Sequence, residues 1–285
     1  MHAGGSRFAY FDGSEIALDD AGALPVRSLR DGHRISLAVG GVRPLHPRDV
    51  DAIAFPLAVG SGRATVLAVA ARAPLDGGCV ERLAALADTA APALQIALDR
   101  DDDRRHAEYD GLTGLLRPIA FRTRLAALVE RARFVRGARL ALVFVDSDRF
   151  KEWNDAFGHA AGDALLRALA AVLRSTADGE DDLAARNGGD EFCLVFAGAG
   201  KADAIERAEV LRARIAEAGR SACESRGAPA LAVTASIGVA AYPADAADAN
   251  ALLECADAAM YHSKRSGRDG VSYRAPRGDG FVRLG

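Results

Sequence analysis

The chain up to about residue 80 consists of short apolar segments separated by Gly, Pro and Asp. Residues 34–39 (RISLAV), 52–57 (AIAFPL) and 64–70 (ATVLAVA) each have the length and composition typical of a β-strand. The last segment is apolar almost throughout and is bounded by Gly62 and Pro74, as expected of a buried strand. This pattern predicts a small, strand-rich N-terminal domain.

A helical period replaces this pattern between Cys79 and about Tyr109. We expect one long helix there, which ends the first domain and leads through the charged stretch 99–105 into the second. Pro92 argues against an unbroken helix, because a proline inside a helix kinks it or costs about 3 kcal/mol. The short apolar seam fits both a helix that caps its own domain and a two-stranded coiled coil between protomers, and the sequence does not decide between them. The apolar positions are Leu83, Leu86, Ala90, Leu94, Ala97 and Leu98.

From about Ala107 onward, helical and strand-like periods alternate. Strands that alternate with helices predict an α/β architecture, in which helices pack on a central sheet. The expected helices are 118–136, 163–175, 202–219 and 250–266, and the expected strands are 139–145, 183–186, 191–196 and 231–241.

Composition and charge indicate a globular protein of about two domains. Of the 285 residues, 50% are hydrophobic and 26% are charged, and the net charge of −3 provides no field that attracts a nucleic acid. No apolar run approaches the ~20 residues of a membrane-spanning helix, and the first residues lack the pattern of a secretory signal. We therefore expect a cytoplasmic protein with no membrane span and no nucleic-acid partner. The four cysteines have no metal-like spacing, and Cys193 is expected to be a buried, unreactive thiol.

Two adjacent carboxylates, Asp190 and Glu191, follow the turn sequence Asn187-Gly-Gly between two predicted strands. Asn-Gly and Gly-Gly supply the positive φ angles of a tight hairpin. Acidic residues beside a hairpin are consistent with solubility alone. Successive strand residues face opposite sides, however, so one of these carboxylates must face the core or a site.

A second acidic segment, Asp146-Ser147-Asp148, follows the predicted strand 139–145. Open α/β sheets place ligand groups beyond the carboxyl ends of their strands. If this strand neighbours the hairpin, Asp146, Asp190 and Glu191 converge into an all-oxygen set that suits Mg²⁺. For Asp148 we favour the role of a turn residue that bonds its own backbone.

Two further polar clusters have ordinary structural explanations when each is considered alone. Asp163 directly precedes an apolar helical pattern and fits a helix N-cap, and Asn154 fits a helix end. Lys264 and Arg268 lie at the end of a predicted helix, where cations compensate the helix dipole.

Considered together, five separated segments resemble the GGDEF-domain diguanylate cyclase family over about residues 107–272. The resemblance implies a palm-like α/β (α+β) fold, with an antiparallel-containing central sheet flanked by helices. The segments are DGLT (110–113), VDSDRFKxxNDxxGHxxGD (145–163), RNGGDEF (186–192), TASIGVA (234–240) and ADAAMYHSKRSGRD (256–269).

Residues 50–100 resemble the second half of a GAF sensory domain. The expected domains are therefore a GAF-like sensory domain over 1–98, a helical linker over 99–109 and a GGDEF domain over 110–285. The sequence does not indicate which small-molecule or protein signal the N-terminal domain senses.

The resemblance to the cyclase family also implies an activity and a metal site. The family condenses two GTP molecules into cyclic di-GMP with release of pyrophosphate, and two metal ions clamp the attacking and leaving oxygens. Mg²⁺ (or Mn²⁺) would be held by Asp146, Ser147, Asp190 and Glu191, with Glu191 also near the attacking 3′-hydroxyl. Each site holds one GTP, so two sites must face each other in a homodimer.

The substrate-binding residues follow from the same resemblance. Asn154 and Asp163 would read guanine, whose N–H donors a carboxylate accepts. Lys264 and Arg268, with Lys151, would neutralise the triphosphate. The backbone of Phe150 would pass near the phosphates.

Several residues depart from the family pattern. Ser147, Trp153 and Asn187 stand next to the expected site, where the family commonly has other residues. Gly179 occupies the position of the arginine in the Arg-x-x-Asp motif at which many relatives bind their product, whereas Asp182 is retained. We therefore expect product to inhibit only weakly.

Two other functions remain open. A degenerate domain would bind nucleotide as a receptor without catalysis, and a related cyclase would make a mixed cyclic dinucleotide. The intact charged residues argue against the receptor, and Asp163 argues for guanine over adenine.

Overall fold

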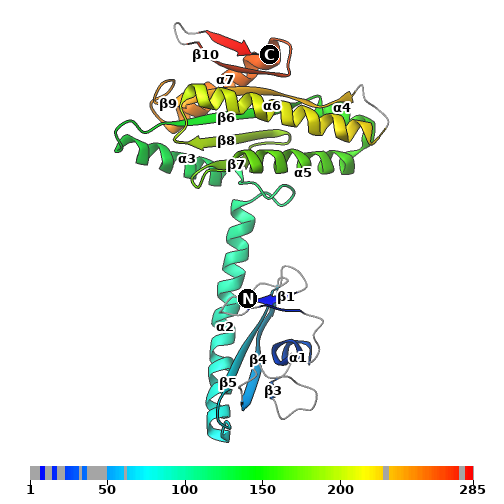
Figure 1. The fold of residues 1–285 in the computed structure, drawn as a ribbon, viewed down its shortest axis with the longest axis vertical. Helices are drawn as coiled ribbons and strands as arrows, with labels where there is room; N and C mark the ends of the chain where they lie inside the picture. The colour runs from blue at the N-terminus through cyan, green and yellow to red at the C-terminus, as the bar shows by residue number, and fades with distance from the viewer. Residues whose placement is uncertain are drawn as a thin grey trace. The chain divides into compact units, whose positions relative to one another are not determined.

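The computed structural model describes residues 7–9, 15–17, 23–31, 34–36, 50–60, 63–226, 231–275 and 280–284. The chain divides into two compact units, Met1–Arg105 and His106–Gly285, each with its own hydrophobic core (Figure 1). No helix in the described ranges has the length and apolar character needed to cross a membrane.

The N-terminal unit is built on a three-stranded antiparallel sheet in the order β3-β4-β5. Side chains alternate along β4, so that Ala54 packs in a cluster with Leu24 of α1, and Phe55 packs in another with Ala87 of α2. The elements are β1 (Arg7–Ala9), β2 (Glu15–Ala17), α1 (Leu24–Asp31), β3 (Ile35–Ser36), β4 (Asp51–Gly60) and β5 (Arg63–Ala71), followed by α2 (Gly77–Glu108).

The sequence predicted the strands of this unit's three-stranded sheet and helix α2, but it did not predict helix α1. The strands expected at 52–57 and 64–70 are confirmed as parts of β4 and β5. Of the strand expected at 34–39, Ile35–Ser36 forms β3, and residues 37–39 lie outside the described residues.

Helix α2 confirms the expected long helix and continues through Pro92 without a break. One of its faces packs on the sheet through Ala87, which is buried next to Phe55. Leu86 and Ile96 remain 56% and 54% exposed on α2. These two large apolar side chains are therefore not needed to fill the core of the N-terminal unit.

The C-terminal unit contains a six-stranded sheet in the order β11-β10-β9-β6-β8-β7. Its neighbouring strands are antiparallel, except for the parallel pair β9 and β10. The strands are β6 (Leu140–Asp148), β7 (Leu183–Arg186), β8 (Glu191–Ala197), β9 (Thr234–Tyr242), β10 (Gly270–Arg274) and β11 (Phe281–Leu284).

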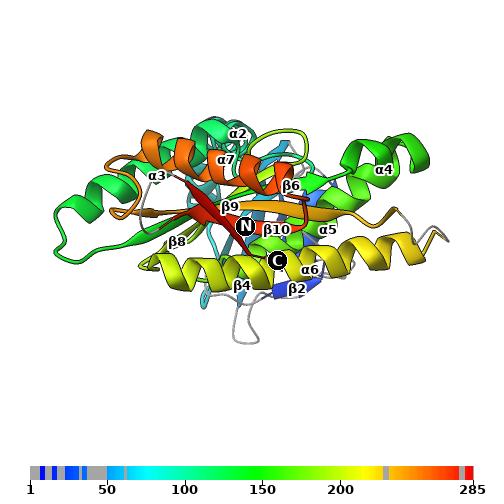
Figure 2. The same ribbon diagram turned by 90° about the horizontal axis from the view of Figure 1, so that it is seen from above.

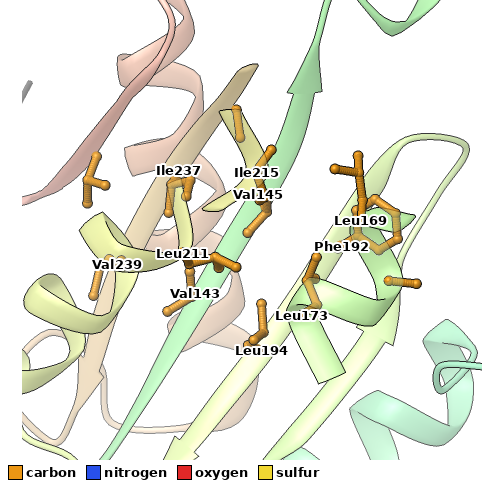
Figure 3. Packing of buried hydrophobic residues seen from close by; sticks show 14 of the residues in the cluster. Val143, Val145, Leu169, Leu173, Phe192, Leu194, Leu211, Ile215, Ile237 and Val239 are labelled. Carbon is orange, nitrogen blue, oxygen red and sulfur yellow. The ribbon is translucent and has the colours of Figure 1, made fainter. Parts of the chain in front are cut away.

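Helices cover both faces of this sheet, and Figure 2 shows α6 and α7 on opposite sides of it. Because side chains alternate along β6, Val143 and Val145 pack with α5 and α6, whereas Leu142 and Phe144 pack with α3 and α7 (Figure 3 shows the first cluster). The helices are α3 (Pro118–Arg133), α4 (Phe150–Phe157), α5 (His159–Thr176), α6 (Lys201–Glu224) and α7 (Ala249–Arg265).

The predicted sheet with flanking helices is confirmed, with differences in the bounds of several elements. Helix α5 begins at His159 rather than at Asp163, because Gly158, at φ 79°, ends α4 and starts α5. The alternative explanation of Asp163 as a helix N-cap is therefore wrong. Strand β6 extends to Asp148, and α4, β10 and β11 were not predicted.

Candidate active site

The acidic end of β6 lies beside the start of β8. The two strands pair directly, and their register sets Asp146 opposite Glu191. The backbone amide of Ser147 donates to the carbonyl of Asp190, 3.2 Å away. The strand before Asp146 is thus a neighbour of the hairpin, which was the condition for the carboxylates to converge. Its geometry differs from expectation, because neighbouring antiparallel strands replace the carboxyl edge of a parallel sheet.

The hairpin between β7 and β8 is closed through Glu191. The backbone amides of Asn187 and Gly188 donate to the Glu191 carbonyl at 2.8 and 3.3 Å, and Asn187 Nδ2 donates to Glu191 Oε2 at 3.4 Å. A Cβ at Gly188 would lie only 2.9 Å from Glu191 Oε2. Glycine at 188 and asparagine at 187 therefore both help to set where the Glu191 carboxylate lies.

Asp146 is a buried carboxylate that is expensive to ionise. It is 6% exposed, and burial, with the nearby charges of Asp190 and Glu191, raises its pKa from 3.8 to about 6. Lys264 works in the opposite direction, with its Nζ 2.5 Å from Asp146 Oδ2. Burial also raises the pKa of Asp190, again against the charge of Lys264. Lys264 alone thus does not offset the effect of burial and of the neighbouring carboxylates on these two pKa values.

These carboxylates fit a divalent cation of the Mg²⁺ type. Among the described residues, no three His, Cys, Asp or Glu side chains already form a closed metal group. Mg²⁺ does not require one, because it is usually bound by one or two carboxylates together with waters and substrate phosphates. An oxygen-only set with raised pKa values at Asp146 and Asp190 is the donor chemistry that such an ion stabilises.

A cavity of about 350 Å³ joins these carboxylates to the basic residues of the site. Lys264 comes from α7, Arg268 from the α7–β10 loop and Lys151 from α4, so three separate elements contribute cations. Cations beside carboxylates in one cavity suit a polyphosphate bound with a metal ion. The lining residues are Asp146, Ser147, Asp148, Arg149, Phe150, Lys151, Glu152, Asp190, Lys264 and Arg268.

Asp148 does not act as the turn residue that we expected. Its buried carboxylate accepts hydrogen bonds from Thr234 Oγ1 at 2.9 Å, Ser236 Oγ at 2.8 Å and the backbone amide of Asp269 at 3.0 Å. The favoured interpretation is wrong because the partners are 86 to 121 positions away rather than local. Asp148 ties β6 to β9 and to the loop that carries Arg268.

Asn154 and Gly162 face each other across the α4–α5 pair. Asn154 Oδ1 is buried and has no hydrogen-bond partner in the described structure, and a Cβ on Gly162 would lie 1.8 Å from it. Phe150 closes the same corner, with its Cζ 3.2 Å from that Cβ position. Asp163 is exposed in the next position of α5. Asn154, Gly162 and Asp163 do not line the 350 Å³ cavity, whereas Phe150 does, so this second corner adjoins the cavity through Phe150.

The three departures from the family pattern that stand next to the expected site have different surroundings. Trp153 is completely buried and packs against Phe157, with ring centroids 4.7 Å apart, so it belongs to the core. Ser147 Oγ is buried without a partner among the described residues, next to the carboxylates. Asn187 touches Glu191 directly.

Sequence reasoning gave no role to Arg186, although it lies inside a recognised motif. Its Nη2 and Nε donate to the Gly189 carbonyl at 2.6 and 3.1 Å, and its Nη1 lies 3.2 Å from Asp110 Oδ1. A cation directly before a glycine hairpin was the available clue. It was not decisive, because Asp110 is 76 positions away.

Comparison with known proteins identifies the class of this unit. Residues 107–270 match the family model "Diguanylate cyclase, GGDEF domain". The match covers more than half of the 285 residues, and the chain belongs to the GGDEF family.

Individual relatives agree with this assignment. An "Uncharacterized signaling protein" of Caulobacter vibrioides is 43% identical over 162 residues, which are 57% of this chain and 19% of the relative. Diguanylate cyclase TpbB of Pseudomonas aeruginosa is 41% identical over 163 residues, 57% of this chain and 36% of TpbB. The chain thus spans about a fifth and about a third of these two proteins.

A solved structure also has a similar fold. The coiled coil and GGDEF domain of DgcB from Caulobacter crescentus, in complex with c-di-GMP, is 30% identical, with a TM-score of 0.57. The similarity covers 66% of this chain and 96% of that chain.

Proposed function

We propose that this protein is a diguanylate cyclase, which condenses two GTP molecules into cyclic di-GMP and two pyrophosphates. One observation carries the proposal: a single cavity joins the carboxylates Asp146 and Asp190 to the cations Lys264 and Arg268. Phosphoryl transfer depends mainly on positioning and on stabilising charge at phosphate oxygens. This cavity has the groups for both tasks.

Asp146, Ser147, Asp190 and Glu191 would hold Mg²⁺ or Mn²⁺. When bound, the metal neutralises phosphate oxygens and lowers the energy of the displacement. The raised pKa of Asp146 supports this assignment, since a nearby divalent cation favours the ionised carboxylate. Glu191, whose carboxylate accepts a hydrogen bond from Asn187 at the hairpin, would orient the attacking 3′-hydroxyl.

Lys264, Arg268 and Lys151 would bind the triphosphate. Arg268 is 59% exposed, and its only ion pair among the described residues is a long one, with Nε 4.0 Å from Asp148 Oδ1, so its guanidinium can form bidentate hydrogen bonds with phosphate oxygens. The backbone at Phe150, at the start of α4, would face the same phosphates, and the N-terminus of a helix favours anions.

Asn154 and Asp163 would select guanine. The buried Asn154 Oδ1 is an unused acceptor, which suits an N–H donor of the base. Adenine presents an acceptor at N1 instead, so Asp163 would lose the hydrogen bond from the N1–H of guanine.

Catalysis would take place between two copies of the chain, because each site holds one GTP. The exposed Leu86 and Ile96 on α2 support a helix-to-helix contact between protomers. We propose a GAF-like sensory role for residues 1–98, responding to a small-molecule or protein signal, with residues 99–109 as linker and 110–285 as the catalytic domain. We also propose that the enzyme acts in the cytoplasm.

The test is to incubate purified protein with GTP, ATP and Mg²⁺ and to identify the products by mass spectrometry. Cyclic di-GMP from GTP supports the proposal. A mixed or adenine-containing dinucleotide contradicts guanine selection. Nucleotide binding without any product indicates the receptor alternative.

A further inference from the structure

The loop that carries Arg268 has an unusual backbone. Gly267, Arg268 and Asp269 all have positive φ angles, of 112°, 60° and 43°. Residues other than glycine rarely adopt the left-handed region, and they persist there only when their surroundings hold them. Arg268 is therefore presented to the cavity by a loop that depends on outside contacts.

Several contacts from the body of the unit hold this loop. The backbone amide of Arg268 donates to the carbonyl of Ser263 on α7 at 3.1 Å, and Arg268 Nε lies 4.0 Å from Asp148 Oδ1. Asp148 accepts the backbone amide of Asp269 at 3.0 Å, and Arg212 of α6 lies with its Nη1 2.6 Å from Asp269 Oδ1. The last two act on the backbone or side chain of residue 269. None of these contacts involves the carbonyl of Arg268.

Arg283, on β11, provides that contact. Its Nη2 donates to the carbonyl of Arg268 at 2.5 Å and lies 3.4 Å from the carbonyl of Asp269. The guanidinium lies over Gly270, where an added Cβ would come 2.5 Å from Arg283 Nε. The absence of a side chain at 270 thus makes room for an arginine from another strand.

Strand β11 lies outside the residues that match the family model, which end at 270. It pairs with β10 at the edge of the sheet, with Ser272 opposite Arg283. The strand therefore brings a contact from the edge of the sheet to a loop of the candidate substrate site.

We infer that Arg283 is a positioning residue for GTP, because it holds the Arg268 loop in the conformation that directs the Arg268 guanidinium into the cavity. The inference rests on the proposed function, in which Arg268 binds the triphosphate. Arg283 acts through Arg268 and does not itself line the cavity.

The first test is Arg283→Ala in the full-length chain. We expect KM for GTP to rise about tenfold with a smaller change in kcat, since binding of the triphosphate is impaired more than the chemistry. In calorimetry, affinity for GTP should fall, while affinity for guanosine should not change. Gly270→Ala should raise KM by displacing the same guanidinium. Val282→Ala, on the same strand but exposed, is the matched control and should keep wild-type values.

A double-mutant cycle separates positioning from general destabilisation. In an Arg268→Ala background, Arg283→Ala should have almost no further effect on KM or on GTP affinity. Equal losses with and without Arg268, or a wild-type KM in Arg283→Ala, would overturn the inference while leaving the cyclase proposal intact. If the wild type makes no cyclic di-GMP, the proposed function fails, and the comparison of GTP with guanosine binding still tests Arg283.

Discussion

Arg186 and Asp110 form an ion pair, 3.2 Å between Nη1 and Oδ1, that connects the start of the catalytic unit to the GGDEF hairpin. The same guanidinium donates to the carbonyl of Gly189, directly before Asp190. Asp110 also accepts the backbone amide and hydroxyl of Thr113. One arginine thus fixes both the first turn of the unit and the carboxylates of the site.

The first prediction concerns this pair. Burial of Asp110 acts to raise its pKa, but the hydrogen bonds from Thr113 and Arg186 outweigh it and hold the pKa below 3.8. A lowered folded-state pKa contributes stability above the unfolded value, and this stability is lost as pH falls through the folded value. Asp110→Asn should therefore destabilise the protein by about 1–2 kcal/mol at pH 7 and by less near pH 3.

Chemical denaturation at both pH values checks this prediction, and Asp103→Asn on the exposed side of α2 is the control. Equal destabilisation at pH 3 and pH 7 would contradict the role given to the ionised Asp110.

Arg186→Ala should in addition lower kcat about tenfold or more, because it releases Gly189 next to Asp190.

The second prediction concerns the cost of ionising Asp146. Its folded-state pKa of about 6 exceeds 3.8, so the folded protein binds more protons than the unfolded chain between these values. Stability therefore falls as pH rises from about 4 to about 6 and stays lower above. Asp146→Asn should stabilise the metal-free protein at pH 7.5, on the order of 1–3 kcal/mol, while abolishing synthesis.

Thermal unfolding in EDTA and in Mg²⁺ measures this effect. The wild type should gain stability from Mg²⁺, and Asp146→Asn should gain much less. Asp148→Asn should behave in the opposite way and lose stability, because it weakens three hydrogen bonds. If the metal-free Asp146→Asn variant unfolds at a lower temperature than the wild type at pH 7.5, then the ionised Asp146 carboxylate does not destabilise the folded protein.

The third prediction is weak product inhibition. Gly179 supplies no guanidinium, and Asp182 is already used: it accepts from the Ala197 amide at 2.8 Å and from Arg207 at 3.1 Å. Arg174, the nearest upstream arginine, donates to the Thr113 carbonyl at 2.7 Å. Progress curves with added cyclic di-GMP should show inhibition that excess GTP relieves. Inhibition that persists at saturating GTP would reveal a separate product site.

The sequence predicted the parts of the site that depend on local pattern. The apolar strand before Asp146 and the glycine hairpin before Asp190 were recognisable because alternation and turn residues act over a few positions. That these two segments lie side by side could be predicted only from the family resemblance, because the hydrophobic pattern of a strand does not determine which strand pairs with it. Helix α4 was missed because eight residues with two acids and one base give little helical pattern.

The errors arose where long-range contacts decide a residue's role. Asp163 has an ideal N-cap sequence, yet the positive φ of Gly158 starts α5 before it. Asp148 was assigned to a local turn, although its partners come from β9 and from the loop after α7. The roles of Arg186 and Arg283 likewise depend on partners that only the folded chain brings close.

The fourth prediction is that residues 1–105 control assembly. In the proposed function, α2 joins a sensory unit to catalytic units that act in pairs, and it would then determine how often two sites meet. Removal of residues 1–105 should therefore weaken dimerisation and lower the specific activity at low protein concentration. Analytical ultracentrifugation and activity assays over a concentration series provide the measurement. Unchanged dimerisation and unchanged activity would argue against this role.

The fifth prediction tests the catalytic carboxylates themselves. The synthesis of cyclic di-GMP from GTP and Mg²⁺ by wild type, Glu191→Ala and Asp190→Ala is the most direct measurement, with exposed Glu180→Ala as control. We predict product from the wild type and the control, and loss of at least about 10²-fold in both hairpin variants, with thermal unfolding changed by only a few degrees. Wild-type turnover in either folded hairpin variant would contradict the assignment of the active site.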